Sequence, residues 1–107
     1  ALETAAVRQF IAEWAAGCRR LQRAGFAGIE ISAGHGHLFH QFLSPLSNHR
    51  DDDFGGTTEN RTRLLREVVT TIREACGRPF MIGLKLPGDD GVPGGIDLAE
   101  ARRIAES

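Results

Sequence analysis

The feature of this sequence that most constrains its fold is an alternation between helix-length amphipathic segments and short apolar runs. Residues 4–24 and 57–77 carry apolar side chains spaced by three and four, a pattern typical of helices that bury one face. Residues 26–32 and 80–86 are apolar runs of strand length, and the first is expected to be a buried strand. Helices and strands that alternate in this way form βαβ units, so we predict an α/β fold with parallel strands.

Shorter elements are predicted between and after these segments. Gly25 is expected to end the first helix. Residues 33–56 mix glycine, histidine, proline and aspartate, which favours a long loop with one short helix at 38–43. Asp97 is expected to cap a third helix, with Glu100 at the reciprocal capping position.

Two strands are too few for a self-sufficient sheet, because both edges and parts of both faces would stay uncovered. The remaining strands must come from the rest of a longer protein or from other copies of the chain. The chain opens at Ala1 rather than at methionine and stops at Ser107, within a helix that has barely begun. We therefore expect residues 1–107 to be a fragment of a single domain.

Composition excludes several function classes. The formal net charge is −1 and the basic side chains are dispersed among acidic ones, which argues against nucleic-acid binding. No apolar run is long enough for a membrane span, so a cytoplasmic location is expected. Cys18 and Cys76 lie in separate helical patterns without metal-type spacing, and they are predicted to be reduced thiols that pack as small hydrophobic side chains.

Candidate functional residues follow the two predicted strands, because reactive groups in parallel α/β proteins gather at the carboxyl ends of strands. The first strand leads into Ser32, His35, His37 and His40. Imidazoles can donate hydrogen bonds or protons near neutral pH, although for each histidine taken singly a solvated loop position is the favoured interpretation. Zinc binding is disfavoured because no fourth ligand has matching spacing, and His40 is the histidine most readily assigned to structure.

Lys85 stands at the end of the second predicted strand. A cation near the end of a buried strand costs free energy unless an anionic or polar group meets it. The residues alone leave two alternatives open, a structural ion pair and a contact with a cofactor.

Two stretches of the sequence resemble a known family. The run AGFAGIEISAGHGHLFHQFLSPLSNHRDDDFGGTTENR and the run IGLKL are similar to conserved strand and loop motifs of the Old Yellow Enzyme family of flavin-dependent oxidoreductases. The likeness covers almost the whole chain in order, which makes it far more specific than a lone glycine motif. It implies an FMN-binding (β/α)8 TIM barrel, of which this chain would be the part around the fourth and fifth strands.

The resemblance also implies roles for particular residues. The family's pair that holds the substrate oxygen is matched by Ser32 and His35, with a hydroxyl in place of the first imidazole. A tyrosine that gives a proton to the substrate carbon is matched by His37. The strand-end arginine that contacts the flavin is matched by Lys85, which keeps the charge and loses the bidentate fork. The loop signature is matched by Asn48, Arg50, Asp53, Gly55, Gly56, Glu59, Asn60 and Arg61, which we interpret as architectural residues.

The implied activity is hydride transfer through FMN, with NADH or NADPH as electron donor and a small-molecule substrate. Replacement of the first histidine and the tyrosine fits an amine dehydrogenase or demethylase branch somewhat better than an ene-reductase branch. A 4Fe-4S cluster, as in the larger relatives, would lie outside this chain. The parent protein is expected to be a homo-oligomer, and the isolated 107 residues are expected to be inactive.

Two other functions are compatible with the sequence. The bare strand edges would allow a non-catalytic module that self-assembles through its sheet. A small metallohydrolase would use His35 and His37, and stoichiometric zinc would be its signature.

Overall fold

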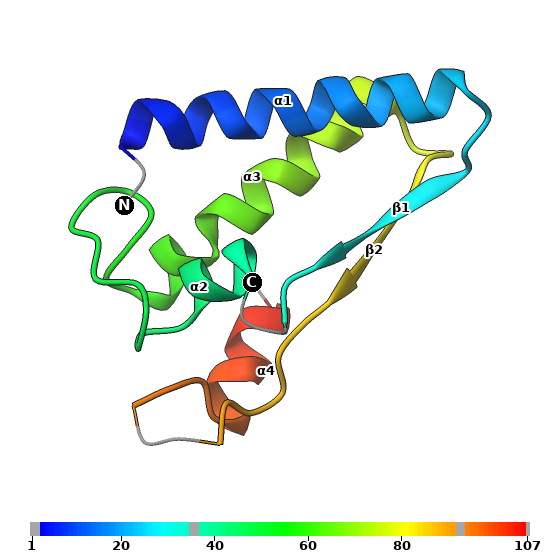
Figure 1. The fold of residues 1–107 in the computed structure, drawn as a ribbon. Coiled ribbons are helices and arrows are strands. Elements are labelled where there is room, and N and C mark those ends of the chain that lie inside the picture. The colour runs from blue at the N-terminus through cyan, green and yellow to red at the C-terminus, as the bar shows by residue number, and fades with distance from the viewer. Residues whose placement is uncertain (1–2, 35–36, 92–93, 107) are drawn as a thin grey trace. The chain divides into compact units, whose positions relative to one another are not determined.

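The predicted alternation of helices and strands is confirmed in a computed structural model, which describes residues 3–34, 37–91 and 94–106 (Figure 1). Each predicted helix is present, and the short helix has the predicted bounds. The elements, in chain order, are α1 (Thr4–Arg23), β1 (Gly28–Ser32), α2 (Leu38–Leu43), α3 (Thr58–Cys76), β2 (Met81–Lys85) and α4 (Leu98–Glu106).

β1 and β2 form a parallel two-stranded sheet. The amide of Met81 donates to the carbonyl of Ala27 at 2.9 Å, and the amide of Ala33 donates to the carbonyl of Lys85 at 2.7 Å. Both bonds advance in the same direction along the two strands, as they do only in a parallel ladder. The two arrows in Figure 1 accordingly point the same way. This arrangement confirms the βαβ prediction.

The chain divides into two compact units, of which the first contains residues 1–31 and 66–83. In this unit α1 lies against the second half of α3. Gln22 Nε2 donates to the carbonyl of Cys76 at 2.7 Å, and Arg8 pairs with Glu67 at 2.7 Å. The buried side chains of the unit are Val7, Ile11, Ala15, Cys18, Ile31, Val68, Ile72, Cys76 and Phe80.

The turn after α1 explains why β1 is shorter than predicted. Gly25 has a φ of 97°, its amide donates to the carbonyl of Gln22, and the amide of Phe26 donates to the carbonyl of Leu21. This is the Schellman arrangement, in which a residue in the left-handed region closes a helix. Because the turn occupies the amide of Phe26, the strand begins only at Gly28.

The second unit contains residues 32–65 and 84–107. Its core forms where α2, the following loop, the first half of α3 and α4 meet. The buried apolar side chains are Ala33, Phe39, Phe42, Leu43, Phe54, Leu64, Leu65, Ile96 and Ile104. Asp97 caps α4 as predicted, since its Oδ1 accepts a hydrogen bond from the amide of Glu100 at 2.8 Å.

The prediction that both strands are buried is wrong for this chain. In β1 only Ile31 is buried, no residue of β2 is, and Met81 is 68% exposed. The strands have the apolar composition of a sheet interior, but two strands leave both outer edges without neighbours. The apolar composition of β1 and β2 is therefore typical of strands in the interior of a larger sheet than the two-stranded one present.

Candidate active site at the strand ends

Ser32 and Lys85 are the last residues of β1 and β2, and they are cross-strand partners. The bond from the Ala33 amide to the Lys85 carbonyl sets this register, and paired residues project from the same face of a parallel sheet. Both side chains are exposed, whereas the adjacent Ile31 is fully buried on the opposite face. The structure thus brings together two of the predicted site residues.

The same face continues towards the amino ends of the strands. A Cβ placed on Gly83 would lie 3.7 Å from the Cγ of Glu30, so these two residues also face each other. Glu30 precedes Ser32 by two positions, and Gly83 precedes Lys85 by two. Two successive cross-strand pairs therefore fix the register that aligns Ser32 with Lys85.

The predicted histidines lie on the segment that leaves β1. His37 is the N-cap residue of α2, with φ −83° and ψ −174°, and its exposed side chain makes no capping hydrogen bond. His35 lies outside the described residues. The proton-donor role of His37 and the substrate-binding roles of Ser32 and His35 stay predictions.

Lys85 is exposed, so the expectation of a buried cation is wrong within this chain. The reason is that Lys85 lies, with Glu30 and Ser32, on an exposed face of the two-stranded sheet. A cationic side chain beside a hydroxyl at the carboxyl ends of parallel strands offers hydrogen-bond donors to an anionic or polar ligand. The contact of Lys85 with a flavin stays a prediction.

The loop after α2 is held by side chains that bind backbone groups, as the sequence predicted. Asn48 Nδ2 donates to the carbonyls of Phe42 and Phe54 at 2.7 and 2.8 Å, and its Oδ1 accepts from the amide of Arg50 at 3.0 Å. Asn60 Nδ2 donates to the carbonyl of Gly55 at 3.0 Å. These bonds satisfy backbone groups that an irregular segment would otherwise leave unpaired.

Asp53 was expected to be the architectural aspartate of the loop, and the structure shows that this residue is Asp52. Asp52 rather than Asp53 organises the turn: its Oδ1 accepts from the amide of Phe54 and from Arg50 Nε, both at 3.0 Å. Arg50 Nη2 also donates to Asp52 Oδ2 at 2.6 Å. The Asp53 side chain is exposed, and only its carbonyl is used, by Arg63 at 2.8 Å.

Arg61 and Glu100 form a buried ion pair that connects α3 with α4. Arg61 also donates to the carbonyl of Leu43 at 3.0 Å and to that of Gly56 at 2.6 Å. Glu100 is further bound by Thr58 Oγ1 at 2.8 Å. The reciprocal capping role predicted for Glu100 is therefore wrong, because its carboxylate serves Arg61 and Thr58.

Burial favours a raised pKa for the Glu100 carboxyl, but it is outweighed by the hydrogen bonds from Thr58 and Arg103 and by the charge and hydrogen bond of Arg61. The net effect is a pKa below the usual range. Glu100 therefore stays ionised inside the second unit, which sequence reasoning missed.

His40 is structural, as the sequence suggested, and its partner is Asp90. His40 Nε2 lies 2.7 Å from Asp90 Oδ1, and Ser44 Oγ donates to Asp90 Oδ2 at 3.1 Å. Burial favours a raised pKa for Asp90, but hydrogen bonds from the Ile96 amide, His40 and Ser44 hold the pKa below its usual range. This cluster joins α2 to the loop after β2.

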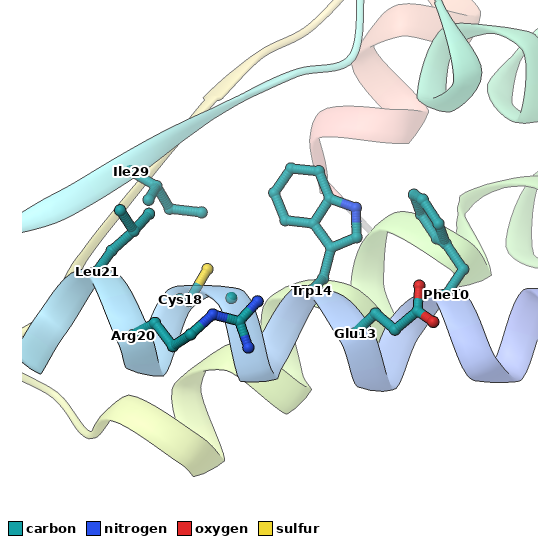
Figure 2. Close-up of a pocket in the computed structure, with 8 residues that line it drawn as sticks. Phe10, Glu13, Trp14, Cys18, Arg20, Leu21 and Ile29 are labelled. Atoms are coloured by element: carbon teal, nitrogen blue, oxygen red, sulfur yellow. The ribbon is translucent and has the colours of Figure 1, made fainter.

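A mostly apolar pocket of about 600 Å³ lies in the first unit, on the face of β1 that carries Ile29 (Figure 2). Since side chains alternate along a strand, this face is opposite the one with Glu30 and Ser32. Burial raises the pKa of the Cys18 thiol at the pocket wall, and Cys76 adds to this effect, so Cys18 has the character of a packed thiol. The lining residues are Phe10, Glu13, Trp14, Gly17, Cys18, Arg20, Leu21 and Ile29.

Within residues 3–34, 37–91 and 94–106, no three His, Cys, Asp or Glu side chains are grouped so that they could hold a metal ion. No helix in the same ranges is both long enough and apolar enough to cross a membrane. The histidine pair that a metallohydrolase would use includes His35, which lies outside these ranges.

Parallel β/α units with polar side chains on one face at the strand ends are typical of α/β enzymes, whose sites form at the carboxyl ends of the strands, as at the rim of an α/β barrel. The NADH:flavin oxidoreductase / NADH oxidase family matches residues 1–107. The chain belongs to this family, which is that of Old Yellow Enzyme, and its fold is part of a (β/α)8 TIM barrel.

Three known proteins illustrate the similarity. The NADPH dehydrogenase of Clostridium acetobutylicum is 46% identical over 84 residues, which is 78% of this chain and 25% of that protein. The structure of histamine dehydrogenase from Rhizobium sp. 4-9 matches with a TM-score of 0.92 and 34% identity, covering 98% of this chain and 16% of that one. Morphinone reductase in complex with tetrahydroNAD matches with a TM-score of 0.83 and 33% identity, covering 98% and 28%.

The chain thus spans about a quarter of the NADPH dehydrogenase that it matches. The similarity extends across both compact units, because the structural matches include nearly all of its residues.

Proposed function

We propose that this chain supplies part of the flavin site of an FMN-dependent oxidoreductase that passes hydride from NADH, NADPH or a small organic substrate through the flavin. Family membership supports the proposal, as does the structure of morphinone reductase with a nicotinamide analogue. The observation that carries it is the pairing of Ser32 with Lys85 at the carboxyl ends of two parallel strands. Ligands of α/β barrels bind at this rim.

The residues present fit a flavin at this position. FMN would supply the ring that accepts and donates the hydride. The Lys85 ammonium would bind the polar edge of that ring and favour negative charge on it. Ser32 Oγ, on the same face, would donate a hydrogen bond to bound substrate. In the reductase branch an imidazole nitrogen of His37 would hold the proton that the substrate carbon receives, and in the amine branch it would take the proton that the substrate nitrogen releases as the carbon gives up its hydride.

The substrate class follows from the two replaced positions. The hydroxyl of Ser32 polarises a carbonyl oxygen less strongly than the imidazole it replaces in the family's pair, and His37 replaces the tyrosine that gives a proton to the substrate carbon. We therefore favour an amine substrate over an enone. The likeness to histamine dehydrogenase supports this choice, whereas the likeness to NADPH dehydrogenases supports the reductase branch. Assaying both substrate classes with one preparation distinguishes the two branches.

The direct test uses the full-length protein that contains this chain. It should purify with FMN and oxidise NADH, NADPH or an amine, whereas residues 1–107 alone should be colourless. His37→Phe should retain FMN and lose ~100-fold or more in turnover, because a positioned general acid or base contributes that much. His49→Phe, at an exposed histidine of the following loop, is the matched control and should turn over normally. A full-length protein that binds no flavin would refute the proposal.

A second candidate concerns the isolated chain, which we propose self-associates through its sheet. Phe26 and Met81 are 59% and 68% exposed, and such apolar surface favours association. Light scattering from residues 1–107 should show oligomers, and a monomer at working concentration would contradict this. The homo-oligomeric state and cytoplasmic location of the whole protein stay predictions.

A further inference from the structure

A carboxylate in the second unit connects the two segments that leave the strand ends. Asp90 lies five positions after Lys85, and its side chain is only 9% exposed. Its Oδ1 is bound by His40 Nε2 at 2.7 Å, and its Oδ2 accepts from Ser44 Oγ at 3.1 Å. His40 and Ser44 belong to α2 and its C-cap. The carboxylate therefore ties α2 to the loop after β2.

The loop after β2 is itself shaped around this carboxylate. The amide of Ile96 donates to Asp90 Oδ2 at 2.8 Å, and the amide of Asp90 donates to the carbonyl of Ile96 at 2.7 Å. A Cβ on Gly95 would lie 2.8 Å from Asp90 Oδ2 and 2.9 Å from Asp90 Cβ. No larger residue fits there unless Asp90 moves, so the backbone has closed tightly over the carboxylate.

The position of this cluster relates it to the candidate active site. His40 follows His37 by three residues, which is less than one helical turn. His37 is the N-cap residue of α2, so the orientation of α2 determines where its side chain lies. On the other side, the segment that contains Asp90 continues directly from Lys85. Asp90 thus fixes the segment that carries His37 relative to the segment that follows Lys85.

We infer that His40 and Asp90 are positioning residues for the reaction, which hold His37 in register with the strand-end cation. Neither side chain is placed to touch substrate, because each is turned towards the other and largely buried, with 18% and 9% exposed. The pair acts through geometry: a hydrogen-bonded charge in a partly buried site tolerates little displacement. This inference rests on the proposed oxidoreductase function.

The test compares substitutions that differ in reach rather than in polarity, in the full-length flavoprotein. Glutamine places an amide donor about where His40 Nε2 lies, whereas asparagine is too short to reach Asp90. His40→Gln should therefore retain wild-type turnover per bound FMN within ~2-fold, and His40→Asn should lose about tenfold, since small displacements in an active site carry costs of that size. His49→Asn, at an exposed histidine, is the matched control and should behave as wild type.

The turnover is that of the NADH, NADPH or amine oxidation shown by the wild-type protein. It is expressed per bound FMN and measured well below the melting temperature, so that a loss of stability alone does not lower it. Unchanged turnover in His40→Asn would overturn the inference, even if the variant melts earlier. If His40→Asn does not retain FMN, the Ser44→Ala variant tests the inference in its place. This variant removes one hydrogen bond to Asp90 and should lower turnover about threefold. Wild-type turnover in Ser44→Ala would then overturn the inference. A wild-type protein without FMN would instead refute the proposed function.

Discussion

The guanidinium of Arg61 and the carboxylate of Glu100 are paired where their side chains are only 10% and 8% exposed. The same guanidinium binds the carbonyls that end α2 and precede α3, at Leu43 and Gly56. One buried charge pair therefore fixes α2, the long loop and α4 around the start of α3. Removal of either partner would leave the other charge buried without compensation.

Arg61→Met should destabilise the full-length protein by ~3–5 kcal/mol, as expected when one member of a buried ion pair is removed. Replacing both partners, as in Arg61→Met with Glu100→Met, should recover much of this loss, since no charge then stays buried. The free energies of unfolding of the single and the double variant are measured by urea denaturation.

The control for this prediction is the exposed pair Arg102–Glu106, whose side chains are 80% and 63% exposed. Arg102→Met should change the free energy of unfolding by less than ~1 kcal/mol. Equal effects of Arg61→Met and Arg102→Met would show that burial of the Arg61–Glu100 pair does not matter for stability.

The free energy of unfolding should depend on pH through the ionisation of the Glu100 carboxyl. The folded protein lowers the pKa of this carboxyl below its ordinary value of 4.5. A carboxyl with a lower pKa in the folded state stabilises the fold fully above its unfolded-state pKa, and this contribution is lost as the pH falls through the folded-state pKa. The free energy of unfolding should therefore decline as the pH falls below ~4.5, and Glu100→Gln should show a shallower decline.

Urea unfolding at a series of pH values checks this comparison of slopes. Asp90, whose pKa is also lowered, contributes in the same direction in both proteins. Parallel curves for wild type and Glu100→Gln would contradict the assignment of the acid sensitivity to Glu100.

Asn48 is expected to stabilise the loop through its amide donors. Asn48→Asp keeps the size and the acceptor but cannot donate to the carbonyls of Phe42 and Phe54. It should cost ~2–3 kcal/mol, because two buried carbonyls lose their partner. Ser47→Ala, which removes one exposed hydrogen bond from the same loop, should cost less than ~1 kcal/mol in the same unfolding assay. An Asn48→Asp variant as stable as Ser47→Ala would contradict this role.

The adjacent glycines of the loop should respond differently to alanine. A Cβ on Gly55 would lie 2.4 Å from the carbonyl oxygen of Arg50, so Gly55→Ala requires the backbone to move. Gly56 has open space but a φ of 96°, so Gly56→Ala meets only conformational strain of ~1 kcal/mol. Melting temperatures should fall further for Gly55→Ala. The reverse order would contradict the described loop geometry.

Local patterns in the sequence predicted most of the fold. The spacing of apolar residues located α1 and α3, and Gly25 marked the end of α1, because these signals lie within a few residues of one another. The strand-end rule selected Ser32 and Lys85, which the register of the sheet pairs. The extent of strand burial was not predictable in this way, since it depends on neighbouring strands rather than on the strands themselves.

The residues that sequence reasoning missed have partners far along the chain. Arg61 and Glu100 are 39 positions apart, and His40 and Asp90 are 50 positions apart. No periodicity or short motif connects such residues. Glu100 also stands three positions after Asp97, where a capping box offered a local explanation that the packing of α4 against α3 overrides.

Lys85 lies beside Ser32 on the face of the sheet where we propose that the flavin binds. The reduction potential of bound FMN in the full-length protein tests this proposal most directly. Lys85→Met should make the potential more negative, because a cation that stabilises the reduced ring is lost, and Lys85→Arg should keep it near wild type. Arg78→Met, at an exposed cation before the amino end of β2, should leave it unchanged. A potential in Lys85→Met equal to wild type would contradict the account.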